Sequence, residues 1–155
     1  MVILMSTINN FWQEFLTVTN QDQSVTYTDS FHFYPEHLAN ELLSLVLSGK
    51  KTATTASFLA YELEGEKLPQ VGDYAIVTDL DGQPHCVIET TAVTLMPFKE
   101  MTFDICKREG EDDTLESWRQ GHERVFREEG KQVGYEFSED MPIVFTDFKV
   151  VWEKQ

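Results

Sequence analysis

A lysine and a threonine three residues apart could together activate a hydroxyl group for nucleophilic attack. Lys51 and Thr54 lie in the segment 49–55, directly after a predicted helix. A lysine that loses its proton in a desolvated site can take the proton of a neighbouring hydroxyl. On a regular strand, residues i and i+3 point to opposite faces, so this pair can meet only where the chain bends or turns. The alternative interpretation is structural: Lys50 and Lys51 complement the negative end of the helix dipole.

A carboxylate within a predicted strand is the second candidate for chemistry. Glu89 lies in the segment 85–96, where counting by twos places it on a largely apolar face. A carboxylate on an inward face is rarely buried unless it is paired. Glu89 could therefore serve a reaction at that face, or it could form a structural ion pair or occupy a solvated edge.

The segment 117–122 of a predicted helix offers residues that could bind a ligand. Trp118 is either a core anchor or a stacking platform, and His122, on the apolar stripe, is a core histidine or a ligand contact. Arg119 lies one step off this stripe. It could bind a phosphate or a carboxylate, although an ion pair on the helix surface is the commoner use of such a residue.

Residues 109–113 gather four carboxylates in one loop. They suit the positive N-terminal end of the following helix, and they lack the alternate-position pattern of a calcium loop. The four histidines are scattered along the chain and suggest no zinc site. We therefore predict neither a metal nor a cofactor.

Composition limits the possible partners. The chain has 155 residues, of which 41% are hydrophobic, and its 12 Lys and Arg against 27 Asp and Glu give a net charge of −15. These values indicate one compact globular domain. Binding to long nucleic acid depends on cationic side chains and is disfavoured by this charge. A short RNA or a small nucleoside-like ligand in a local cleft remains compatible with it.

The sequence shows no feature that would direct the chain to a membrane. The apolar start at residues 1–5 lacks a basic leader, and no stretch approaches the roughly 18 apolar residues of a membrane span. Cys86 and Cys106 match no metal or redox spacing and are expected to be reduced and buried. We expect a cytoplasmic protein without a membrane partner.

Hydrophobic periodicity predicts an α+β fold. Strands interrupted by helices, with a hairpin around Asp81-Gly82, favour a mixed or antiparallel sheet that curves into a small barrel. The expected elements are helices over residues 7–17, 35–48, 97–108 and 114–129, strands over 74–78, 85–96 and 144–152, and a connector over 19–30.

Six segments, in their order and spacing over about residues 31–152, resemble the ASCH domain family. This resemblance implies a PUA-like fold, a small β-barrel flanked by helices, in a domain over residues 31–155 that follows a helix and connector over 1–30. The segments are Gly49-Lys50-Lys51-Thr52-Ala53-Thr54, Pro69-Gln70-Val71-Gly72-Asp73, Glu89-Thr90-Thr91, Arg108-Glu109-Gly110-Glu111, residues 115–122 and residues 137–142.

The resemblance also implies a function and a set of site residues. Family members have been proposed to bind RNA in a cleft beside the barrel, some small members remove the acetyl group from N4-acetylcytidine, and others have been reported as ribonucleases. By similarity to the amidohydrolases, Lys51, Thr54 and Glu89 match a Lys-Thr-Glu catalytic set. The residues expected to contact the ligand are Gly49, Lys50, Trp118, Arg119 and His122.

Three hypotheses follow from these observations. The first is a hydrolase that acts on a small acylated nucleoside-like amide. The second is an RNA-binding or nucleotide-binding module without turnover. Ribonuclease activity lies between these two hypotheses and could use the same lysine. The third is a protein–protein adaptor that uses the apolar stripe of the N-terminal helix, although packing of that stripe on the chain's own barrel is the simpler expectation.

Overall fold

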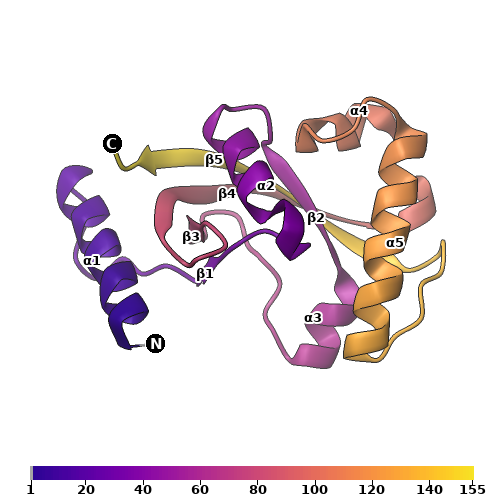
Figure 1. Cartoon of the computed structure of the whole chain (residues 1–155), viewed down its shortest axis with the longest axis horizontal. Coiled ribbons are helices and arrows are strands. Elements are labelled where there is room, and N and C mark those ends of the chain that lie inside the picture. Colours follow the sequence, from indigo (N-terminus) through magenta and orange to yellow (C-terminus); the bar gives the residue numbers. More distant parts are fainter. Residues whose placement is uncertain (1) are drawn as a thin grey trace.

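The computed structural model describes residues 2–155, with side chains from residue 7 onward. Helices and strands are mixed along the chain, as in an α+β protein (Figure 1). None of the helices within the described part is long and apolar enough to cross a membrane. In chain order, with η for a 3-10 helix, the elements are α1 (Val2–Val18), β1 (Asp29–Phe31), η1 (Glu36–Leu38), α2 (Ala39–Leu47), β2 (Ala53–Ser57), α3 (Phe58–Glu64), β3 (Tyr74–Thr78), β4 (Pro84–Pro97), η2 (Phe98–Glu100), α4 (Phe103–Cys106), η3 (Lys107–Glu109), α5 (Leu115–Val133) and β5 (Pro142–Glu153).

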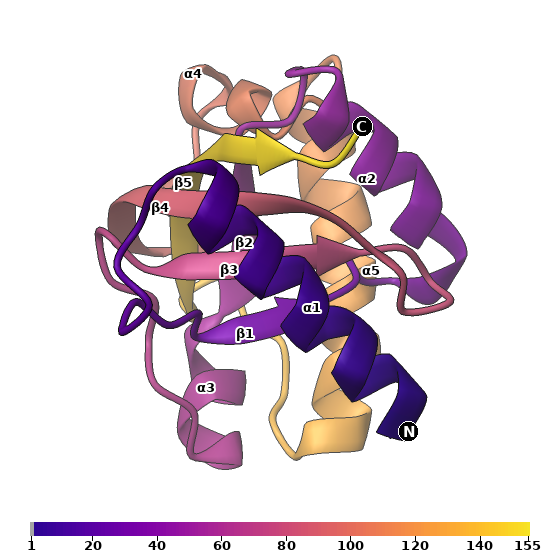
Figure 2. The ribbon, with the colours of Figure 1, turned by 90° about the vertical axis from the view of Figure 1, so that its left-hand side faces the viewer.

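The five strands form one curled sheet in the order β1-β3-β4-β5-β2. β1 runs parallel to β3, whereas all other neighbours are antiparallel. Two register shifts between β4 and β5 bend these long strands, because a β-bulge increases the local twist. The sheet therefore curls into a half-barrel (Figure 2), with β2 at one edge. The predicted small, curved, mixed sheet flanked by helices is confirmed.

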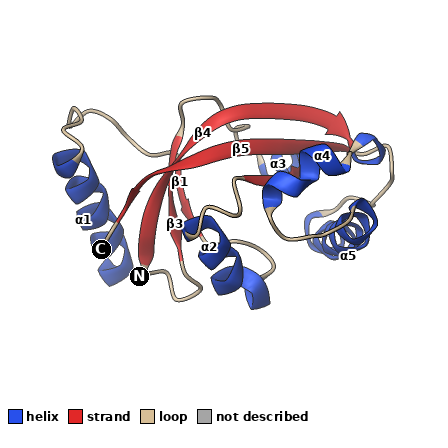
Figure 3. Cartoon of the chain, turned by 90° about the horizontal axis from the view of Figure 1, so that it is seen from above, coloured by secondary structure: helices blue, strands red, loops and turns tan. Residues whose placement is uncertain are grey.

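α1 covers one face of the sheet with the apolar stripe predicted from the sequence (Figure 3). Phe11, Trp12 and Phe15 are almost fully buried and pack against Ile76 of β3 and Val87 of β4. The stripe that an adaptor would present to a partner is thus covered by the chain's own sheet.

α2 and α5 cover two other parts of the sheet (Figure 1). Leu42 and Val46 of α2 pack against Ile88 of β4, whereas Trp118 of α5 belongs to a separate cluster with Phe145 of β5. The edge strand β2 lies between these two helices, and this arrangement positions the site described below.

Three short elements, β1, β2 and α3, were not indicated by the sequence. The connector predicted over residues 19–30 ends in β1, and the Ala-Thr-Thr-Ala-Ser sequence of β2 has no apolar alternation. α3 begins at a local cap, because the Ser57 hydroxyl accepts a hydrogen bond from the main-chain N–H of Ala60 at 3.3 Å. It ends at Gly65, which adopts the left-handed conformation that favours glycine.

One predicted helix is broken in the structure. The segment 97–108 contains η2, α4 and part of η3, because Met101 and Thr102 between them are extended. The remaining predictions agree with the structure. The helix predicted over residues 35–48 corresponds to η1 and α2, and the helix predicted over 114–129 corresponds to the first part of α5. β3 and β4 flank the turn at Asp81-Gly82. The strand predicted over 144–152 lies within β5.

Candidate functional site

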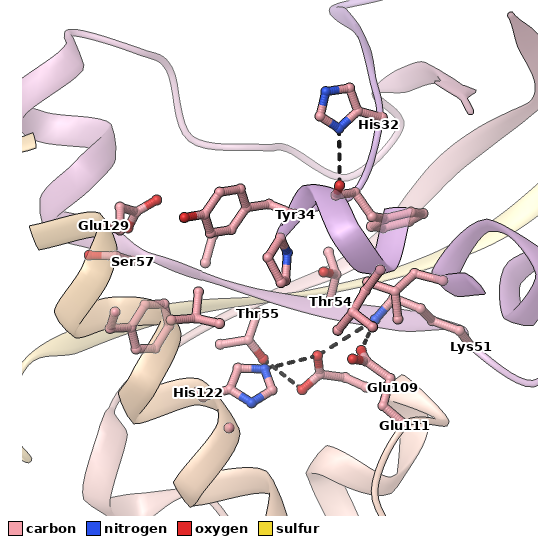
Figure 4. A pocket seen from close by; sticks show the side chains of 18 of the residues that line it. His32, Tyr34, Lys51, Thr54, Thr55, Ser57, Glu109, Glu111, His122 and Glu129 are labelled. Carbon is pink, nitrogen blue, oxygen red and sulfur yellow. Dashed lines mark hydrogen bonds and ion pairs between the residues drawn. The ribbon is translucent and has the colours of Figure 1, made fainter. Parts of the chain in front are cut away.

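A cavity of about 530 Å³ opens along the edge of β2 (Figure 4). Residues 54–57 of β2 form one wall, residues of the segment 29–38 and of α2 form another, and residues 121–129 of α5 form a third. Small-molecule sites in proteins enclose roughly 300–1,000 Å³, so this cavity is large enough for a ligand of nucleoside size.

Lys51 reaches this cavity from a bend between α2 and β2. The main-chain N–H groups of Lys50 and Lys51 donate to the Leu45 carbonyl at 2.9 and 3.0 Å, so the chain folds back over the end of α2. Lys51 is only 2% exposed, and its Nζ donates to the carbonyl oxygen of Ala53 at 2.8 Å. Because the chain bends here, the side chains of both Lys51 and Thr54 line the cavity.

Two carboxylates neutralise the buried Lys51 ammonium. Its Nζ lies 2.6 Å from Oε2 of Glu111 and 3.6 Å from Oε1 of Glu109. Removing one partner from such a buried ion pair leaves an uncompensated charge, so the three side chains depend on one another. Lys51 therefore belongs to an internal ion cluster, whereas Lys50 is exposed at the end of α2.

Gly110 allows both glutamates to approach Lys51. This glycine has a φ of 71°, in the left-handed region, and a Cβ atom at its position would lie 2.3 Å from the carbonyl oxygen of Lys50. The loop is further fixed by the main-chain hydrogen bond from Thr52 to the Arg108 carbonyl at 2.8 Å. Only glycine fits so close to the neighbouring backbone.

Glu109 is the centre of a buried hydrogen-bond network. It is 1% exposed, and its Oε2 accepts hydrogen bonds from Thr55 Oγ1 at 2.9 Å and from Trp118 Nε1. Its Oε1 lies 3.4 Å from Nε2 of His122. One carboxylate thus connects β2, α5 and the Lys51 bend.

Oxygen atoms on both sides of the His122 ring favour its cationic form. Its Nδ1 lies 2.9 Å from the main-chain oxygen of Trp118, and its Nε2 faces Glu109. Burial would lower the His122 pKa, but the hydrogen bond and charge of Glu109 outweigh burial and raise it. Burial would likewise raise the Glu109 pKa, but His122, Lys51 and Trp118 together lower it.

The other charged residues of the cavity are mainly acidic. Lys51 and His122 lie against Glu109 and Glu111, and Arg124 is the remaining Lys or Arg side chain among the described lining residues. Four further carboxylates line the cavity, from Asp29, Glu41, Asp112 and Glu129. The cavity therefore favours uncharged or cationic ligands over anionic ones.

Glu129 and Tyr34 mark the end of the cavity opposite Lys51 (Figure 4). Oε1 of Glu129 accepts a hydrogen bond from the Tyr135 hydroxyl at 2.6 Å. Burial raises the pKa of Glu129 despite this hydrogen bond. This end therefore presents carboxylate and phenol oxygens, whereas the Lys51 end presents the ion cluster.

The structure brings together some of the predicted site residues and separates others. Lys51, Thr54 and His122 line the cavity, but Glu89 does not. Glu89 pairs with Tyr74 across the β3–β4 ladder and follows Val87 by two residues, on the face of the sheet that α1 covers. The ion-pair partners of Lys51 are instead Glu109 and Glu111.

The other predicted ligand contacts lie outside the cavity lining. Trp118 is fully buried beneath His122 and stacks with Phe98. An Arg119 guanidinium nitrogen donates to the main-chain oxygen of Lys99 at 3.2 Å. Gly49 and Lys50 are exposed at the end of α2.

Sequence reasoning missed the roles of Glu109 and Glu111. The sequence predicts only that their acidic loop complements the helix dipole, and this role requires no distant partner. The available signal was the glycine between them, since Glu-Gly-Glu at a left-handed turn can aim both carboxylates at one cation. No cluster of three or more possible metal ligands occurs within the part of the chain that the structure describes.

A curled, mixed sheet with a ligand-sized cavity at its edge strand defines a PUA-like domain. The chain belongs to the ASCH domain family, whose model matches residues 29–152. It is similar to a protein of Enterococcus faecalis described by the family model DUF984, with 36% identity, a TM-score of 0.88 and coverage of 95% of this chain and 89% of that one. It is also similar to an ASCH domain from Lactobacillus crispatus, with 34% identity, a TM-score of 0.83 and 94% coverage of both chains. The comparison with curated proteins gave no match.

Proposed function

We propose that this protein hydrolyses a small, uncharged, acylated nucleoside-like amide in the cavity beside β2. The observation that supports this most directly is the buried Lys51 ammonium, which lies 2.6 Å from Glu111 in a cavity that Thr54 also lines. Family resemblance suggests a Lys-Thr-Glu catalytic set. The contacts of Lys51 favour Glu111, rather than Glu89, as its carboxylate.

In the proposed reaction, the Thr54 hydroxyl attacks the acyl carbon of the substrate amide. Lys51 takes the hydroxyl proton once its own proton has passed to Glu111 along their 2.6 Å contact. The carbon–nitrogen bond then breaks as Lys51 gives that proton to the leaving nitrogen, which departs as an amine. Water next attacks the acyl-threonine ester while Lys51 carries its proton to Thr54. The acid is released, and the Glu111 proton returns to Lys51.

The charge of the cavity favours an uncharged substrate over RNA. A phosphate would meet Asp29, Glu41, Asp112 and Glu129, while the Lys51 cation is already neutralised by its two glutamates. RNA affinity comes largely from cations that displace counterions from phosphates, and such cations are scarce here. Binding without turnover remains the alternative hypothesis, and it would apply equally to an uncharged nucleoside.

The proposal can be tested with N4-acetylcytidine and a panel of other acylated nucleosides, by quantifying the released products chromatographically. We expect product from the wild type and a loss of at least a hundredfold in kcat for Lys51→Ala, Thr54→Val and Glu111→Gln, since each removes a group from the proton path. Asp113→Asn removes an exposed carboxylate from the same loop and serves as the matched control. Absence of product from a folded wild type would overturn the hydrolase proposal.

Glu89→Gln and Glu111→Gln provide a direct comparison between the two candidate carboxylates. Loss of activity only in Glu111→Gln would support the assignment made from the Lys51 contacts. Loss only in Glu89→Gln would restore the assignment made from the sequence. A short RNA incubated under the same conditions tests the ribonuclease alternative.

A further inference from the structure

The main-chain edge of β2 forms part of the cavity wall. Side chains of successive strand residues point to opposite faces, yet Thr54, Thr55, Ala56 and Ser57 all line the cavity. β2 is an edge strand with β5 on one side only. The cavity therefore lies against the other side of β2, where the strand offers its main-chain groups.

The register of β2 with β5 identifies which main-chain groups face the cavity. The Phe148 N–H donates to the Thr52 carbonyl at 3.0 Å, so Thr52 directs its carbonyl toward β5. This direction alternates along an antiparallel strand. The main-chain N–H and C=O of Thr54 therefore also point toward β5, whereas those of Ala53 and Thr55 point toward the free edge. The carbonyl of Ala53 accepts its hydrogen bond from the Lys51 side chain, in agreement with this alternation.

Thr55 consequently directs an N–H and a C=O into the cavity. Outside the β2–β5 ladder, no hydrogen bond within the described residues involves either of these main-chain groups. The side-chain hydroxyl of Thr55 is bonded to Glu109 at 2.9 Å, which fixes the residue on the strand. The unpaired N–H and C=O groups of an edge strand are ready to pair with another chain or with a ligand.

We propose that the N–H and C=O of Thr55 form the substrate-recognition element of this cavity. In an extended residue these two groups lie side by side, so they match a planar ligand that carries an acceptor next to an N–H donor. An acylated amino group beside a ring nitrogen has this pattern. Recognition at a strand edge reuses the hydrogen bonding by which an added strand joins a sheet. This inference rests on the proposed function and identifies the donor–acceptor edge of the substrate as the part that Thr55 binds.

The position of Thr55 suits this role. The edge-facing carbonyl of Ala53 is already occupied by Lys51, so Thr55 is the next residue of β2 whose edge is open to a ligand. It lies roughly 7 Å further along the strand, at about 3.3 Å per residue. A ligand held there would have its acyl group beside Thr54 and the Lys51 cluster.

Proline substitution can remove the N–H of Thr55 without breaking the ladder, since an edge strand tolerates proline where the N–H points away from its neighbour. Thr55→Pro should be compared with Thr55→Val, which also lacks the hydroxyl but keeps the N–H. We expect Thr55→Pro to lose at least a further tenfold in kcat/KM on N4-acetylcytidine relative to Thr55→Val, mainly through a higher KM. Equal values for two folded variants would overturn the inference.

A binding measurement tests the same inference without requiring turnover or a proline. N4-acetylcytidine is titrated into the 15N-labelled Thr54→Val protein, and amide resonances are followed by NMR. We expect the Thr55 N–H to shift downfield and gain protection from exchange, whereas the ladder-bonded N–H groups at positions 54 and 56 change little. No response at Thr55 in a protein that otherwise binds the nucleoside would overturn the inference.

The two experiments separate the inference from the proposed function. If the wild type does not hydrolyse N4-acetylcytidine but the Thr55 N–H responds to it, the hydrolase proposal fails and edge recognition is supported. A second outcome is that the wild type hydrolyses N4-acetylcytidine, the Thr55 N–H shows no NMR response, and Thr55→Pro and Thr55→Val have equal kcat/KM. This outcome overturns edge recognition but leaves the hydrolase proposal standing. Absence of both hydrolysis and any NMR response overturns both.

Discussion

Nζ of Lys51 lies 2.6 Å from Oε2 of Glu111, a residue 60 positions later in the chain. With Glu109 on its other side, Lys51 is a buried cation that two carboxylates of one short loop neutralise. The contact joins the start of β2 to the loop that precedes α5. The geometry of the cavity therefore depends on ion pairs between residues that are distant in the sequence, as well as on apolar packing.

Glu109→Gln should destabilise the fold strongly. The carboxylate is buried and receives or faces four groups, from Lys51, Thr55, Trp118 and His122. We expect a loss of about 3–5 kcal/mol in the free energy of unfolding, because the buried His122 then lacks a carboxylate partner and Lys51 keeps only Glu111. Urea denaturation measures this change. Glu111→Gln, whose side chain is 21% exposed, should cost less. Equal losses in the two variants would contradict the central role assigned to Glu109.

The ion pair between Glu109 and His122 should make stability depend on pH. The Glu109 pKa is lowered, so its contribution is present above the ordinary value of 4.5 and is lost as the pH falls through the folded-state pKa. The His122 pKa is raised, so its contribution is complete below the ordinary value of 6.5 and is lost as the pH rises through the folded-state pKa. The pair therefore stabilises most between pH 4.5 and 6.5.

His122→Gln tests this dependence. The difference in unfolding free energy between wild type and variant should be larger at about pH 5.5 than at about pH 9, because the contribution of a raised His122 pKa declines as the pH rises above the ordinary value of 6.5. Urea denaturation at the two pH values measures it. His37→Gln, at an exposed histidine, controls for the loss of an imidazole. A difference that stays constant across this range would contradict the ion pair.

Gly110→Ala should damage the site more than its left-handed backbone alone explains. Gly65 has a similar φ, 67° against 71°, but nothing lies within 4 Å of its Cβ position, whereas the Gly110 position meets the Lys50 carbonyl at 2.3 Å. We expect Gly65→Ala to cost about 1–2 kcal/mol from backbone strain. Gly110→Ala should cost more and should also lower activity, because the loop must move away from Lys51. Thermal unfolding and the nucleoside assay measure the two effects, and equal behaviour of the variants would contradict the close approach.

Much of this fold could be predicted from the sequence, because its longer elements carry periodic apolar patterns. The stripe of α1 around Phe11 and Trp12 and the alternation of β5 fix which faces are buried. β2 could not be predicted in this way, since Ala-Thr-Thr-Ala-Ser has no apolar alternation. Its place in the sheet comes from pairing with β5, about 90 residues away in the chain.

The candidate site could be predicted only in part. Lys51 and Thr54 are close in sequence, so their possible cooperation was visible there. The carboxylate partner was not, because Glu89 and Glu111 both lie far from Lys51 in the sequence, and the fold is needed to tell which of them contacts it. The structure separates them: Glu89 faces the side of the sheet that α1 covers, whereas Glu111 contacts Lys51.

If the proposed hydrolase activity is present, the acidic lining of the cavity should make it discriminate against substrates that carry a phosphate. We expect kcat/KM for N4-acetylcytidine to exceed that for its 5′-monophosphate by at least tenfold at low salt, since a dianion would meet the carboxylates of Asp29, Glu41, Asp112 and Glu129. Raising the ionic strength to about 0.5 M should narrow this ratio, because salt screens such charges. Arg124→Gln, which removes the exposed cation at the cavity, should widen it. Competition between the two substrates in one reaction measures the ratio directly, and equal turnover of nucleoside and nucleotide at low salt would show that the lining charges do not select the substrate.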